Sequence, residues 1–258
     1  MTIATPLEHL LRRDRWLVAG SLMIVCGACW AWIVPMARDM YGSMAGSSAW
    51  MMTSTWDQAH VLLLFVMWTA MMTGMMLPSA APALLVYGMV VRRSDDAVDA
   101  PLRIHIFAGG YLLVWTAFSA AATLAQRGLA EAGVLSPMME ARGQRVSAAF
   151  LVVAGLYQLT PWKRACLHAC QSPAVFIARH WRRGRAGALR LGLAHGWYCL
   201  GCCWALMLLL FVGGVMNLAV ILGLTVFLLV EKLMPLGVQG GRLSGALLVA
   251  YGYWMTLR

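Results

Sequence analysis

Charged side chains are scarce in this sequence. Asp, Glu, Lys and Arg make up 12% of the 258 residues, whereas 61% are hydrophobic. A soluble domain of this size needs more charge to cover its surface. Several apolar runs reach the roughly 20 residues that cross a bilayer, and they are continuous rather than alternating as in a membrane β-barrel. The sequence therefore predicts an all-α, polytopic transmembrane helix bundle in contact with the lipid bilayer.

Acidic residues are the scarcest charged class, and known catalytic motifs are missing. There are 10 Asp and Glu against 20 Lys and Arg. No G-x-S-x-G, H-E-x-x-H, phosphate-binding loop or C-x-x-C-H haem motif occurs. We therefore expect a protein that is not an enzyme. The net charge of +10 does not indicate nucleic-acid binding, because the arginines form short clusters beside apolar segments, where they set membrane orientation.

The apolar segments predict about seven spans within a single integral membrane domain, residues 1–258. The expected spans are approximately residues 16–36, 59–91, 104–126, 145–160, 191–213, 216–233 and 242–257. The second span is too long for one straight crossing and contains Pro78 and Pro82. Each proline removes a backbone donor, so the helix should kink or break there. The connection 162–190 is expected to be long and basic.

The distribution of basic residues predicts the orientation. Basic clusters occur before the first span and in alternate loops, and the largest lies in residues 163–190. Cytoplasmic loops carry the excess of Lys and Arg, so the N-terminus is expected to be cytoplasmic. The loop 127–145 carries three arginines and opposes this orientation, but its cluster is smaller.

Five of the seven cysteines lie between Cys166 and Cys203. Helical spacing places His195, Cys199 and either Cys202 or Cys203 on one face. Cys166 and Cys170 share a face if Pro161 starts a helix and Pro173 ends it. The predicted metal ligands of this group are Cys166, Cys170, His195, Cys199, Cys202 and Cys203. Thiolate and imidazole suit Cu(I), Zn(II) or an iron–sulfur centre. The alternative is packing of small apolar cysteines, which we assign to Cys26 and Cys29.

Methionine is abundant, with 19 residues. The stripe in the second span contains Met67, Met71, Met72, Met75 and Met76, and a similar interval relates Met36, Met40 and Met44 in the expected outer loop. Thioethers are soft ligands that can hold Cu(I) where a thiol would oxidise. Of the stripe, we name Met71, Met72, Met75 and Met76 as candidate ligands. The alternative is that methionine only fills gaps between helices.

Glu231 ends a long apolar run and is followed at once by Lys232. A carboxylate at this position could act as a ligand or as charge balance beside an inner metal cluster. The alternative is a local surface pair between the two neighbours. The sequence alone weighs these two interpretations equally.

Three motifs resemble those of one bacterial family. They are Trp68-Thr69-Ala70-Met71-Met72 continuing to Met76-Leu77-Pro78, then Leu159-Thr160-Pro161-Trp162-Lys163 with Cys166 and Cys170, and finally His195-Gly196 with Tyr198-Cys199, Gly201-Cys202-Cys203-Trp204 and Glu231-Lys232. The family is that of predicted metal-binding integral membrane proteins, a domain of unknown function sometimes labelled copper chaperone. The resemblance covers about residues 58–240. It implies metal binding and a multi-pass location in a bacterial inner (cytoplasmic) membrane.

The leading hypothesis is a membrane protein that handles Cu(I), by transport or by delivery to a cuproprotein or metallochaperone. Outer methionines would capture the ion, the stripe would relay it, and the Cys/His group would receive it. The alternative is a non-transporting assembly factor or subunit of a membrane complex, with a structural zinc site. A thiol-based membrane redox enzyme is a third, weaker alternative.

Overall fold

The computed structural model describes residues 6–42, 56–93, 99–234 and 237–257, with the backbone alone for residues 6–17. The helices are α1 (Pro6–Met40), α3 (Gln58–Arg92), α4 (Ala100–Glu131), α5 (Gln144–Leu159), α6 (Pro161–Gln171), α7 (Pro173–His180), α8 (Gly184–Cys203), the 3₁₀ turn η2 (Trp204–Met207), α9 (Leu208–Gly213), α10 (Leu218–Leu233) and α11 (Gly237–Thr256). Within the described ranges the one β pairing is an isolated bridge between Leu135 and Ala141. The predicted all-α class is confirmed.

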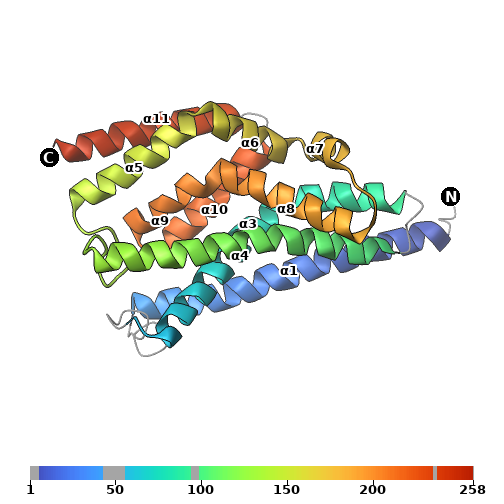
Figure 1. Ribbon diagram of the computed structural model, residues 1–258, viewed down its shortest axis with the longest axis horizontal. Helices are drawn as coiled ribbons and strands as arrows, with labels where there is room; N and C mark the ends of the chain where they lie inside the picture. The colour runs from blue at the N-terminus through green and yellow to red at the C-terminus, as the bar shows by residue number, and fades with distance from the viewer. Residues whose placement is uncertain (1–5, 43–55, 94–98, 235–236, 258) are drawn as a thin grey trace.

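The helices pack as one bundle around a core that α3, α4 and α8 share (Figure 1). Figure 1 shows α5 and α11 side by side along one edge. Glycine lets the backbones of α4 and α8 approach closely: a Cβ on Gly110 would lie 2.7 Å from the Leu189 carbonyl oxygen and 3.0 Å from the Leu193 nitrogen. Such small-residue contacts are typical of helix pairs in membranes. They bring α8, which carries most of the predicted ligands, against α4.

All seven segments predicted to span the membrane are helical. Among the described residues, four helical segments are long and apolar enough to cross a membrane: Val18–Met40, Gln58–Arg92, Ala100–Glu131 and Gly184–Gly213. By contrast, α5 and α10 have 16 residues each. At about 1.5 Å per residue such a helix is about 24 Å long, short of about 30 Å of hydrocarbon. The structure thus supports four spans, and seven remains a prediction.

Of the predicted kink or break at Pro78 and Pro82, the break does not occur, because α3 continues through both prolines, and the kink stays a prediction. Pro78 has no N–H, so the carbonyl of Gly74 loses its partner within the helix. Trp30 Nε1 on α1 donates to this carbonyl at 3.2 Å, and the Cys26 thiol donates to it at 3.5 Å. The neighbouring helix therefore satisfies the group that proline leaves unpaired, which keeps the helix intact.

Two further boundaries differ from expectation. The connection 162–190 is not an open loop but contains α6 and α7, which begin at Pro161 and Pro173. Moreover, α8 begins at Gly184, seven residues before the expected start of the span. Cys199 therefore lies fifteen residues, about 22 Å, from the first residue of α8. Cys199, Cys202 and Cys203 consequently lie among the last five residues of α8, far from its first residue.

Candidate metal site

The helix α6 holds Cys166 and Cys170 in the predicted one-turn relation. Its first turn is capped by Thr160, whose Oγ1 accepts from the Lys163 N–H at 3.2 Å, and Pro161 occupies the first helical position. The helix packs against α8 at a glycine, since a Cβ on Gly201 would lie 2.8 Å from Cys166 Sγ. This contact sets the thiols of α6 beside those of α8.

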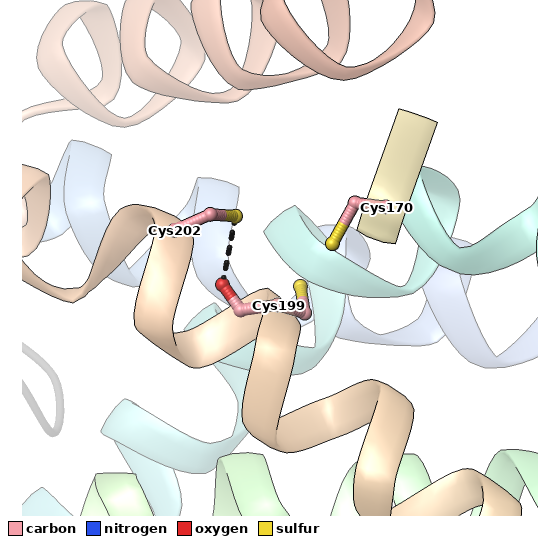
Figure 2. Close-up of side chains that lie close together, drawn as sticks. All are labelled: Cys170, Cys199 and Cys202. Carbon is pink, nitrogen blue, oxygen red and sulfur yellow. Dashed lines mark hydrogen bonds between the residues drawn. The ribbon is translucent and has the colours of Figure 1, made fainter. Parts of the chain in front are cut away.

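Three thiols from these two helices converge. The sulfur atoms of Cys170, Cys199 and Cys202 all lie within 4.8 Å of one another. Figure 2 shows Cys199 and Cys202 on α8 and the Cys170 sulfur directed toward Cys199 from α6. Hydrogen bonds to the sulfurs of Cys199 and Cys202 raise the pKa of the Cys170 thiol well above its ordinary value, and burial adds to this effect. A single soft cation bound to the three sulfurs could take the place of the protons in these hydrogen bonds.

The end of α8 shapes the sulfur cluster, which we define as Cys170, Cys199 and Cys202. Here the α-helix gives way to the 3₁₀ turn η2. Both Cys202 and Cys203 direct their Sγ atoms to the Cys199 carbonyl oxygen, each at 3.0 Å. Of the two thiols that spacing alone left open, Cys202 belongs to the sulfur cluster. Cys203 is fully buried beside it.

Two polar side chains that spacing alone did not place there contact the Cys199 sulfur. Lys232 Nζ donates to Cys199 Sγ at 3.0 Å and to Ser79 Oγ at 3.0 Å. The Tyr111 hydroxyl lies 3.1 Å from the same sulfur and donates to the Met76 carbonyl oxygen at 2.9 Å. A lysine at the end of a long apolar run was the available signal, because such a residue needs a buried partner.

Glu231 does not form a surface pair with Lys232, which was one of the two roles that the sequence allowed for it. Both residues are buried, at 2% and 4% exposure. The Glu231 carboxylate pairs with Lys163 at 2.5 Å, and Lys163 also donates to Gln158 Oε1. The side chains of Glu231 and Lys232, although adjacent in sequence, therefore have different partners. Glu231 contacts a lysine, and Lys232 contacts a thiol. Glu231 lies outside the sulfur cluster.

The remaining predicted Cys/His ligands lie near the sulfur cluster without joining it. His195 is buried one turn before Cys199, among the rings of Phe107, Tyr111 and Phe176. Its Nδ1 atom has no hydrogen-bond partner within the described residues. Cys166 is half-buried, and burial raises the pKa of its thiol. The structure leaves the ligand roles of these two residues as predictions.

The methionine stripe is entirely interior. Met67, Met71, Met72, Met75 and Met76 are all 0% exposed and belong to the common core. Met36 and Met40 lie in α1 and are buried, so they do not belong to an outer loop as expected. Met44 lies outside the described residues. Burial suits both gap-filling and a relay, so a role of the stripe as ligands stays a prediction.

A family model described as copper chaperone, PpoB2, matches residues 65–255. The chain belongs to this copper chaperone family. The match includes α11 and so extends beyond the region of about residues 58–240 that the motifs indicated. No curated protein and no solved structure matches the chain. Family membership and a cluster of three thiols thus agree on soft-metal chemistry.

Proposed function

We propose that this membrane protein binds Cu(I) at Cys170, Cys199 and Cys202 and delivers it to a cuproprotein. The observation that carries the proposal is the convergence of three sulfur atoms within 4.8 Å. Thiolate sulfur is the soft donor that favours Cu(I). Membership of the copper chaperone family supports delivery as the purpose of binding. The protein acts by holding and passing on the ion rather than by catalysing a reaction.

The buried lysine supports a monovalent ion over zinc. Lys232 Nζ lies 3.0 Å from Cys199 Sγ, so any metal on that sulfur sits close to a positive charge. Repulsion at a given distance is proportional to the charge of the ion, so Zn(II) is repelled twice as strongly as Cu(I). At the same time the ammonium group stabilises the negative charge of a copper-bound thiolate. The structural zinc site remains the rival function.

The copper content of the purified protein tests this proposal. The full chain is expressed with copper, purified in detergent without oxygen, and analysed for copper and zinc by mass spectrometry. We expect stoichiometric copper in the wild type and its loss in Cys170→Ser, Cys199→Ser and Cys202→Ser. Cys26→Ser is the matched control, since Cys26 is a half-buried cysteine of α1 bonded to Gly74. Unchanged copper content in all three cluster variants would contradict the proposal. Zinc in place of copper would favour the structural zinc site instead.

Delivery and transport are separated in cells that lack the protein. Delivery predicts that a cuproprotein loses its copper while total cell copper stays constant. Transport across the membrane predicts a change in total cell copper. We place the protein in a bacterial inner membrane with its N-terminus cytoplasmic, on the basis of its apolar helices and basic loops. Reporter fusions at the two termini test this orientation.

A further inference from the structure

A cavity opens beside the sulfur cluster. It has a volume of about 630 Å³ and is lined by residues of α4, α6, α8 and η2, among them Phe118, Trp197, Trp204 and Cys166. Trp197 at its rim is 70% exposed. Of the described residues that line this cavity, one is a cysteine, Cys166. The cavity therefore gives one thiol contact with the surroundings of the protein.

Cys166 also lies next to the sulfur cluster. It is one turn before Cys170 on the same face of α6. Its sulfur sits against Gly201, the residue directly before Cys202, where a Cβ would come within 2.8 Å of it. Cys199 and Cys202, by contrast, are 1% and 0% exposed. Cys166 is thus the thiol between the cavity and the buried sulfurs of Cys199 and Cys202, whereas Cys170 is half-buried like Cys166.

We infer that Cys166 is the exchange thiol of this site: Cu(I) passes through its sulfur on the way between the cavity and the sulfur cluster. The inference rests on the proposed function, because it needs Cu(I) at the cluster. In the exchange step a bond from Cu(I) to Cys166 forms while the bond to one cluster sulfur breaks. Cys166 loses its proton and the released thiolate gains one. The ion stays Cu(I), so no electron is transferred.

Ligand exchange through an added thiol would give Cys166 a role distinct from that of the three cluster thiols. A buried three-coordinate ion is protected but slow to leave, since each bond must break before a new one forms. An accessible fourth thiolate lets the new bond form first. The role of Cys166 is therefore kinetic: its loss should change the rate of transfer and leave the amount of copper held unchanged.

The test compares equilibrium and rate on the full chain in detergent. Copper-loaded wild type, Cys166→Ser and the control Cys26→Ser are mixed with bathocuproine disulfonate, and the coloured Cu(I) complex is followed in time. We expect equal copper content in all three and release at least tenfold slower in Cys166→Ser. Release at the wild-type rate would overturn the inference. Loss of copper from Cys166→Ser would also overturn it, because Cys166 would then be a resident ligand.

A second measurement uses the wild type alone, so that the inference can be tested even if Cys166→Ser does not fold. Copper-loaded protein is treated with N-ethylmaleimide and the modified cysteines are located by peptide mass mapping. We expect Cys166 to react before Cys170, Cys199 and Cys202, and the modified protein to release copper slowly. Earlier modification of the cluster cysteines would refute the exchange role. Failure of the proposed function would show differently, as absence of copper from the wild type before any rate is measured.

Discussion

Two buried lysines make opposite use of their charge. Lys163 meets a carboxylate, Glu231, at 2.5 Å and is also bonded to Gln158, so its network links α5, α6 and α10. Lys232, the next residue after Glu231, meets a sulfur and a hydroxyl instead. In the first region, positive and negative charge balance within the protein. In the second, the ammonium group donates to the Ser79 hydroxyl and to the Cys199 sulfur.

The comparison separates structure from function. A buried ion pair that already has its counter-charge has no need of a ligand, and it contributes to how the helices are joined. A buried ammonium group whose partner is a thiol favours the thiolate, the form in which cysteine binds a metal. Loss of the first network should therefore reduce stability, and loss of the second should reduce copper binding. The variants below test this division.

The largest expected effect is on stability, from Glu231→Ala. This change leaves Lys163 buried without its counter-charge, which typically costs about 3–5 kcal/mol. We expect a lower unfolding temperature in detergent, with unchanged copper per folded protein. The double variant with Lys163→Met should recover much of the loss, because the orphaned charge is removed as well. If Glu231→Ala alone were as stable as the wild type, the ion pair between Glu231 and Lys163 would not have the structural role assigned to it.

The second effect is on copper, from Lys232→Met. Hydrogen bonds to charged groups are worth about 1.5–3 kcal/mol, which corresponds to about 10- to 100-fold in affinity. We expect Cu(I) affinity, measured by competition with bathocuproine disulfonate, to fall by about this factor. The preference for Cu(I) over Zn(II) should fall too. Lys232→Arg keeps the charge and serves as the control. Equal Cu(I) affinity in Lys232→Met and the wild type would remove the distinction between the two lysines.

A smaller effect is expected from Tyr111→Phe. The change removes the hydroxyl that lies 3.1 Å from Cys199 Sγ and bonds the Met76 carbonyl oxygen. A neutral hydrogen bond contributes about 0.5–1.5 kcal/mol, or up to about tenfold in affinity. We expect a modest loss of Cu(I) affinity in the same competition assay. A loss larger than that of Lys232→Met would show that the tyrosine, not the lysine, dominates the environment of Cys199.

The smallest effect distinguishes adjacent cysteines. Cys203→Ser should keep its copper, because Cys203 bonds the Cys199 carbonyl oxygen but is not among the three sulfurs within 4.8 Å. The serine hydroxyl can make the same hydrogen bond, so stability should change by about 1 kcal/mol or less. Cys202→Ser is the matched comparison and should lose copper. Equal copper loss in both variants would place Cys203 in the sulfur cluster.

Residue spacing predicted which side chains share a face of one helix, but it did not predict contacts between residues far apart in the sequence. The turn between Cys166 and Cys170, and the helix from Pro161 that carries it, follow from periodicity and proline placement. The start of α8 at Gly184 was missed, because this residue lies within a basic stretch that resembled a loop. The partner of the Gly74 carbonyl, which Pro78 leaves without a donor in the helix, could not be predicted, since Trp30 is 44 residues from Gly74.

The sequence by itself determined the class of this protein and the kind of chemistry it carries. Few charges and long apolar runs indicate membrane helices, and clustered thiols indicate a soft metal. Only the tertiary structure decided which thiols meet and what faces them. Cys170 joins Cys199 and Cys202 because Gly201 lets α6 approach α8, and Lys232 reaches Cys199 because α10 packs against α3. Helical periodicity fixes neighbours within one helix, whereas contacts between helices depend on how all their surfaces fit together.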